Sequence, residues 1–296
     1  MFQPEALAAA IAGLIGVLGT LALLFWRASV RQTTLVPAWW WSLIALWAWA
    51  GVEILAALSN LTAAWLAPLR YSAVALSFCP MMAVLGAKRP QHAAWSFIVL
   101  SLWAILALPA AETFFLQRGQ RLEINDARSW FLWLLISLGP VNYLPTRHRL
   151  TALLLAAGQI IALSDYLPLI GQPLFSANVS VGLFIASIGL AAFKRPRFGI
   201  EFQRGRRFDR LWLDFRDSFG LLWALRLQER VNSVAQTNDW DVELSWSGFR
   251  DKQGQPIEQF EPAIEPALRT TLKGLLRRFV TNEWIADRLG SDLDLS

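Results

Sequence analysis

Seven apolar stretches, separated by short polar connections, occupy the first two thirds of the chain. Each is close to the 20 or so residues that an α-helix needs to cross the hydrocarbon core of a bilayer. Because backbone amides find no water in lipid, such stretches fold as helices, whose backbone groups bond internally. The sequence therefore predicts an all-α membrane bundle of seven transmembrane helices over residues 1–193. The stretches cover residues 5–26, 36–58, 61–87, 93–110, 128–144, 150–170 and 176–193.

The basic residues between the stretches predict the orientation of this bundle. Lys and Arg occur in the first, third and fifth connections and after the seventh stretch, whereas the N-terminus and the second and sixth connections have none. The fourth connection, residues 111–127, carries charges of both signs. Connections on the cytoplasmic side of a membrane are enriched in Lys and Arg. We therefore expect the N-terminus outside the membrane and the C-terminus in the cytoplasm.

Composition agrees with a membrane protein and argues against nucleic acid as a partner. Only 17% of the residues are charged, whereas soluble proteins average about 25%. The net charge of +5 is not gathered in the C-terminal third, because residues 194–296 contain seventeen Lys or Arg and sixteen Asp or Glu. The single cysteine, Cys79, excludes an intrachain disulfide and a paired-cysteine metal motif. We expect the lipid bilayer, and no nucleic acid, as a partner.

The C-terminal third begins with a basic collar at residues 194–207. An anionic membrane leaflet attracts such a segment, so we expect its side chains to bind lipid headgroups. The basic residues of the collar are Lys194, Arg195, Arg197, Arg204, Arg206 and Arg207.

Residues 208–290 show the periods of a small α+β module. Apolar residues first recur at spacings of three and four, which predicts a helix, and then alternate, which predicts a strand. Proline residues introduce a second helical pattern. The expected elements are a helix over 208–234, a strand over 242–246, a turn over 250–255, a returning strand over 257–260 and a helix over 265–289, ahead of a disordered tail at 291–296.

The predicted module is cytoplasmic and has its own apolar core. An alternative is that its first helix lies flat on the membrane, with its tryptophans in the interface. The residues predicted for the core are Trp212, Phe215, Phe219, Leu244, Trp246, Leu272 and Phe279.

Polar side chains inside the apolar stretches form the candidate site. A charge in lipid costs from about 2.5 kcal/mol upward, so an arginine there usually pairs with a carboxylate. We expect Arg70 to pair with Glu53, Asp165 or both. The pair is either a buried contact that fixes helix register or part of a ligand or ion pocket that opens outward. At about 1.5 Å of rise per residue, the polar groups fall in the outer half of the bundle. The candidate residues are Arg70, Glu53, Asp165 and Gln159, with Tyr71 and Tyr166 beside two of them.

Several activities lack the residues that they need. No lysine lies inside a stretch to form a Schiff base. The two histidines, His92 and His148, lie at expected helix ends and not within the bundle, where a bis-histidine haem would need them. Residues 194–296 contain no histidine to accept a phosphoryl group, and no Walker or GxGxxG pattern follows a strand. We therefore predict no catalytic residues, no cofactor and no metal site.

The segment AAWLAPLRYSAVALSFCPMMAVLGAKRP at residues 63–90 resembles the third helix of the seven-helix membrane sensor modules at the N-terminus of some bacterial histidine kinases. The resemblance covers residues 1–193 at most and implies a sensor-like bundle in a bacterial inner (plasma) membrane. The kinase part is absent, so the resemblance implies a sensor-like or regulatory protein whose tail binds an unknown cytoplasmic protein. A small-solute or ion transporter or channel is the alternative, and a membrane assembly or scaffold protein is the third class.

Overall fold

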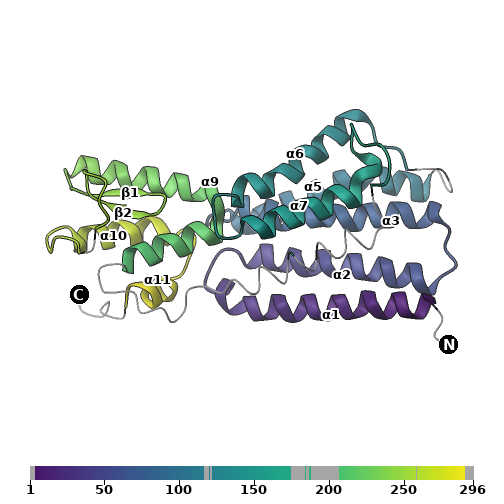
Figure 1. The fold of residues 1–296 in the computed structure, drawn as a ribbon, viewed down its shortest axis with the longest axis horizontal. Coiled ribbons are helices and arrows are strands. Elements are labelled where there is room, and N and C mark those ends of the chain that lie inside the picture. The colour runs from purple at the N-terminus through teal and green to yellow at the C-terminus, as the bar shows by residue number, and fades with distance from the viewer. Residues whose placement is uncertain are drawn as a thin grey trace.

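The computed structural model describes residues 4–116, 120, 122–174, 184, 187, 207–257 and 259–290. It is elongated, with a bundle of long helices at one end and a small module of helices and a β-hairpin at the other (Figure 1). We call the end of the bundle that meets the module the module end, and the opposite end the far end.

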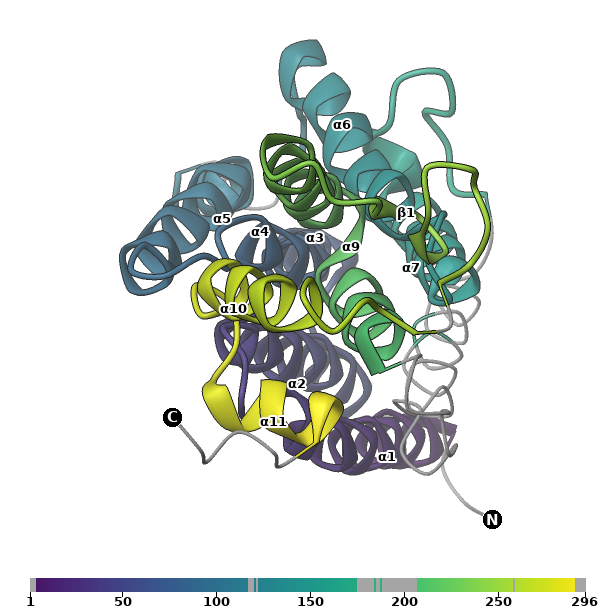
Figure 2. The same cartoon turned by 90° about the vertical axis from the view of Figure 1, so that its left-hand side faces the viewer.

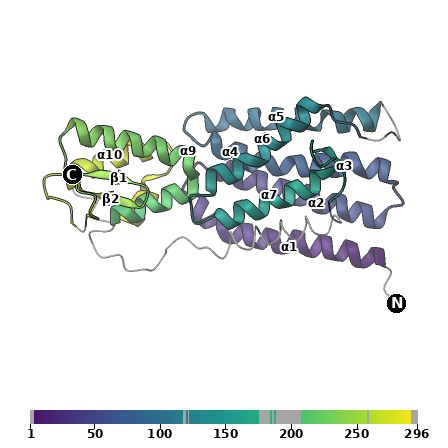
Figure 3. The same cartoon turned by 45° about the horizontal axis from the view of Figure 1, so that its top comes forward.

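The bundle helices run along the long axis of the molecule, and the two views agree that α5 and α1 lie on opposite sides of the bundle (Figures 2 and 3). Helix α3 continues through the short 3-10 turn η1 into α4, and α7 continues into η2. The bundle elements are α1 (Pro4–Val30), α2 (Val36–Leu58), α3 (Ala63–Ala75), η1 (Leu76–Phe78), α4 (Cys79–Leu85), α5 (His92–Phe115), α6 (Asp126–Tyr143), α7 (Arg149–Leu163) and η2 (Ser164–Tyr166).

Four helical segments are long and apolar enough to cross a membrane, and they overlap the first four predicted stretches. The first, second and fourth of them carry large apolar side chains that are exposed on the outside of the bundle, which suits contact with lipid chains, whereas the third is mostly buried. Helices α6 and α7 overlap the fifth and sixth stretches, but α7 has only 15 residues. The seventh stretch lies outside the described residues apart from Phe184 and Ser187. The four segments are Ala9–Val30, Val36–Leu58, Ala63–Leu85 and Ala94–Phe115.

The third of these segments is irregular in its middle, at η1. Pro80 has no N–H to donate, and its ring clashes with the carbonyl four residues earlier in a regular helix. That carbonyl belongs to Leu76, the first residue of η1. The proline therefore accounts for the local change from α-helix to 3-10 geometry, while the segment as a whole continues.

Helix α9 (Arg207–Thr237) opens the module and is sharply kinked at Gly220, whose φ is 77° and ψ is −174°. Glycine adopts this backbone conformation far more readily than residues with a side chain. The two halves of α9 form a V whose apex points at the module end of the bundle (Figure 1). The sequence predicts helix over this region, but the reversal of direction within it is a finding of the structure.

The β-hairpin differs from its prediction. Strands β1 (Glu243–Ser245) and β2 (Gly248–Arg250) are antiparallel and are joined by a tight turn at residues 246–247 that the sequence did not predict. The predicted turn at 250–255 is also present, because the Ile257 N–H donates to the carbonyl of Phe249 at 3.2 Å and Pro256 pairs with Arg250. The carboxylate of Asp209 on α9 accepts a hydrogen bond from the backbone N–H of Phe249 at 2.7 Å. This contact holds the chain at Gly248, where a Cβ would come within 2.5 Å of Asp209. The turn at residues 246–247 is therefore placed by α9.

The second predicted helix is two helices, α10 (Glu265–Leu276) and α11 (Asn282–Leu289). Between them, three backbone groups bond to the helix connections of the bundle and not along a continuous helix. Thr281 N–H donates to the carbonyl of Gln32 at 2.9 Å, and Thr34 N–H donates to the carbonyl of Phe279 at 2.8 Å. The Arg89 N–H also donates to the carbonyl of Arg278, at 2.8 Å.

The module and the module end of the bundle share one hydrophobic core. Its bundle members come from α1, α2, α4 and α5, and its module members come from every helix and strand of the module. Six of the seven residues predicted for the module core are buried in it, including Phe215 and Leu244, while Trp246 is half-buried. Because the apolar side chains of α9 lie in this core, the arrangement does not match a helix lying flat on a membrane. A second core lies between α3, α5, α6 and α7.

Candidate functional site

An ion pair joins α2 to α3 inside the bundle. Arg70 Nε donates to Glu53 Oε1 at 2.9 Å, and Arg70 Nη2 donates to Glu53 Oε2 at 2.8 Å. This is the two-pronged geometry that guanidinium and carboxylate groups favour. The side chain of Arg70 is 42% exposed and that of Glu53 is 19% exposed. The pair is thus partly open to the surroundings of the bundle, and its two charges cancel.

The other predicted site residues do not join this pair. Asp165 lies exposed on η2, and among the described residues the acidic partner of Arg70 is Glu53 and not Asp165. Gln159 is buried on α7 and donates to the hydroxyl oxygen of Ser77 at 2.9 Å. The rings of Tyr71 and Tyr166 pack edge to face, with centroids 5.1 Å apart. The predicted site is therefore divided into an ion pair, an amide–hydroxyl contact and an aromatic pair.

The predicted basic collar lies outside the described residues except for Arg207. Arg207 is the first residue of α9, and its Nη1 donates to the carbonyl of Leu289 at 3.0 Å. This bond satisfies a carbonyl at the end of α11 that would otherwise have no partner within the helix. Arg207 therefore holds the start of α9 to the end of α11.

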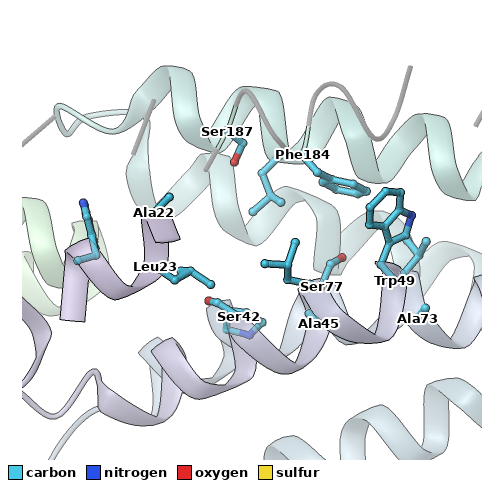
Figure 4. A pocket seen from close by; sticks show the side chains of 14 residues that line it. Ala22, Leu23, Ser42, Ala45, Trp49, Ala73, Ser77, Phe184 and Ser187 are labelled. Atoms are coloured by element: carbon cyan, nitrogen blue, oxygen red, sulfur yellow. The ribbon is translucent and has the colours of Figure 1, made fainter. Parts of the chain in front are cut away.

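An apolar pocket of about 260 Å³ lies between helices of the bundle (Figure 4). Small side chains on three neighbouring spans leave this space open: Ala22 on α1, Ala45 on α2 and Ala73 on α3. Trp49 and Phe184 face each other at one end of it (Figure 4). The complete lining is Ala22, Leu23, Trp26, Ser42, Ala45, Leu46, Trp49, Ala73, Val74, Ser77, Pro80, Leu155, Phe184 and Ser187.

The polar groups of this pocket are few and uncharged. The Ser42 hydroxyl already donates to the carbonyl of Ala38 at 2.9 Å, and the Ser77 hydroxyl accepts from Gln159. The indole N–H of Trp26 is buried and has no hydrogen-bond partner among the described residues. The described lining contains no ionisable side chain. The pocket therefore suits an apolar molecule.

A single side chain, Asn142 near the end of α6, binds both halves of the α9 V. Its Nδ2 donates to the carbonyl of Phe219 at 3.4 Å, and its Oδ1 accepts from the backbone N–H of Leu222 at 3.1 Å. Asn142 is fully buried, so these bonds replace hydration of the backbone groups at the kink. A Cβ at Gly220 would lie 2.1 Å from Asn142 Nδ2, so the close approach also requires glycine. Neither residue stands out in the sequence, where the one signal is a glycine inside an amphipathic helix.

A second attachment joins α9 to the end of the third span. The indole N–H of Trp223 donates to the carbonyl of Val84 at 2.9 Å, and its ring packs on Phe279 with centroids 5.0 Å apart. The Thr34 hydroxyl donates to the carbonyl of Ala87 beside this contact. The α1–α2 connection, the end of α4 and the module thus meet at one place.

Ion pairs reinforce the junction and the module. Asp217 on α9 lies 3.5 Å from Arg147 in the α6–α7 connection and 2.8 Å from Arg216. Inside the module, Arg288 Nε donates to Asp214 Oδ2 at 2.9 Å, with both side chains 5% exposed. Burial lowers the pKa of Arg288 from its usual value, and the charge of Asp214 opposes that shift. Each buried carboxylate thus has a cation in contact.

Among the described residues, no three His, Cys, Asp or Glu side chains gather in a way that could hold a metal ion. Comparison of the chain with protein-family models, curated proteins and solved structures gives no match.

Proposed function

We propose that this chain is a sensor-like regulatory membrane protein in which an apolar molecule in the bundle pocket controls the module. One observation carries the proposal: the helices that line the pocket are the helices whose ends are fixed to the module. A ligand that spreads or draws together these helices would act directly on the module attachments.

The first connection runs through α1 and α2. Leu23 and Trp26 line the pocket, and Val30, one turn beyond Trp26, lies in the core shared with the module. The indole N–H of Trp39 donates to the carbonyl of Leu23 at 2.7 Å, and Trp39 is also in the shared core. A shift of α1 at the pocket would therefore be transmitted to this core through contacts that are already formed.

The second connection runs through α4 and α9. Pro80 lines the pocket, and Val84, one turn later, accepts the hydrogen bond from Trp223. Packed helices and hydrogen-bonded elements of this kind carry coupling where they have two arrangements that a ligand distinguishes. The V of α9 has a glycine at its apex, which is where such an element can change its angle with least backbone strain.

A transporter is less well supported than a sensor. A path for ions or polar solutes needs polar or ionisable groups along it, whereas the described lining of the pocket has neither acids nor bases. The charged residues of the predicted site, Glu53 and Arg70, neutralise each other between two helices. An assembly or scaffold protein would not require the pocket.

The proposed orientation places the module in the cytoplasm of a bacterial cell, with seven spans in the inner membrane. The basic connections support it, because residues 27–31, 88–89 and 147–149 all lie at the module end of the bundle. The likeness of residues 63–90 to sensor modules of bacterial histidine kinases supports the same class of protein. In this proposal the module acts on a cytoplasmic protein partner instead of on a kinase domain of its own.

Filling the pocket by mutation tests the proposal without knowledge of the ligand. Ala45→Phe places a ring where Ala45 lines the pocket, whereas Ile44→Phe places one on the exposed side of the same helix. The full chain is reconstituted in nanodiscs, and hydrogen exchange is measured along the module. We expect Ala45→Phe, and not Ile44→Phe, to change exchange at residues 216–224 and 277–284. Equal effects of both variants, or no change with either, would reject the coupling.

A further inference from the structure

A basic groove lies where the module meets the bundle. It has a volume of about 930 Å³ and is formed by the α4–α5 connection, by α10 and by the segment from α10 into α11. Four of its side chains are cations and one is an acid. The cations are Arg89, Lys273, Arg277 and Arg278, and the acid is Glu283.

The cations of the groove have no acidic partners within the described part of the chain. All four are exposed, and none takes part in an ion pair there. This differs from the buried arginines of the module, which contact Asp214 or Asp217. A hydrogen bond from Thr281 lowers the pKa of Glu283, so this acid is ionised at neutral pH and offsets one of the four charges. The groove therefore keeps a net positive charge that an anion can neutralise.

The depth of the groove in the membrane follows from the spans on either side of it. Arg89 is four residues beyond Leu85, the end of the third span, and Pro90 is four residues before Ala94, the start of the fourth. The backbone bond from Arg89 to Arg278 holds the α10–α11 segment at the same level. The headgroup region of a bilayer extends roughly 5–8 Å beyond the hydrocarbon core on each side. Arg89 and Arg278 therefore lie at the level of lipid phosphates, and Lys273 and Arg277 line the same groove.

We propose that this groove binds the phosphate headgroup of an anionic phospholipid and so fixes the module against the membrane surface. Lys and Arg side chains near an anionic leaflet attract its lipids, and guanidinium groups match the geometry of phosphate oxygens. This site differs from the predicted collar at residues 194–207, because its cations come from a span connection and from α10. It is independent of the proposal for the apolar pocket.

The test compares two double variants of the full chain. Lys273→Gln with Arg277→Gln removes two groove cations, and neither side chain forms an ion pair in the described structure. Arg230→Gln with Lys252→Gln removes two exposed cations of the module that do not line the groove. Native mass spectrometry of each protein in detergent measures retention of phosphatidylglycerol against phosphatidylcholine with the same acyl chains. Inorganic phosphate is added as a competitor, and thermal melting shows whether each variant is folded.

The wild-type protein should retain phosphatidylglycerol in preference to phosphatidylcholine. Each cation near an anionic surface raises the affinity for an anionic lipid about fivefold. Removal of two groove cations should therefore lower the preference for phosphatidylglycerol roughly 30-fold, whereas the control variant should keep it. Absence of a preference in the wild type, or equal loss in both folded variants, would overturn the proposal. Displacement of the lipid by millimolar phosphate would assign the groove to a soluble phosphate and overturn the lipid assignment. If the groove variant does not fold, Arg89→Gln with Arg278→Gln takes its place.

Discussion

Replacing Asn142 by alanine should release the α9 V from the bundle. The substitution removes the acceptor for the Leu222 N–H and the donor to the Phe219 carbonyl. The first bond is worth about 1 kcal/mol net, and a buried carbonyl left without a donor costs about 1–3 kcal/mol. Because Asn142 is fully buried, water does not readily replace its amide. The expected loss of stability is therefore about 2–4 kcal/mol.

Tyr143→Phe is the matched comparison for this variant. Tyr143 is the next residue of α6, and its hydroxyl donates one bond, to the Ser218 carbonyl at 3.1 Å. Removal of that hydroxyl keeps the ring and should cost only about 1 kcal/mol. Asn142→Asp should fall between the two, because it keeps an acceptor for Leu222 but turns an oxygen toward the Phe219 carbonyl.

Thermal unfolding of the full chain in detergent measures the difference. At roughly 2–4 °C for each kcal/mol in a chain of this size, Asn142→Ala should lower Tm by about 4–16 °C and Tyr143→Phe by about 2–4 °C. Limited proteolysis should show faster cleavage near residue 220 in Asn142→Ala. If Asn142→Ala melts no lower than Tyr143→Phe, the amide does not hold the two halves of α9 together.

Three further variants test other contacts, each by the same melting measurement. Gly220→Ala should strongly destabilise the fold, since the new side chain would have to adopt a φ of 77° and its Cβ would lie 2.1 Å from Asn142. If the variant melts at the same temperature as the wild type, the kink tolerates a side chain. Asp214→Ala should cost about 3–5 kcal/mol because it removes the carboxylate in contact with the buried Arg288, and a loss under about 1 kcal/mol would contradict that. Arg70→Leu combined with Glu53→Leu should melt closer to the wild type than either single change, and additive losses would count against the pairing.

The sequence predicts the helices of the bundle well because their signal is local. Apolar length alone places the four segments that are long enough to span a membrane, and the excess of Lys and Arg in alternate connections agrees with one end of the bundle meeting the module. The Arg70–Glu53 pair could also be predicted from the sequence, since a charge in an apolar stretch needs a partner nearby. Asp165, the other carboxylate considered, lies on η2, where α7 has already ended.

The errors in the module have a common physical cause, which is contact with distant parts of the chain. The additional turn at residues 246–247 forms where Asp209 holds Phe249, and the last predicted helix is interrupted where Thr281 bonds to Gln32. The pocket could not be predicted because it is open only where small alanine side chains from three spans meet. Alanines are common in membrane helices, so these positions do not stand out in the sequence. Asn142 likewise reads as one more polar residue at the end of a span.

The basic connections at the module end have two physical effects at once. Their charge favours retention of that end in the cytoplasm, and the same segments also hold the module. Arg147 lies 3.5 Å from the carboxylate of Asp217, and the backbone of Arg89 donates to Arg278. The module also shares one hydrophobic core with the ends of the bundle helices beside these segments. A change in helix positions at the module end must therefore alter both the shared core and the contacts that hold the α9 V.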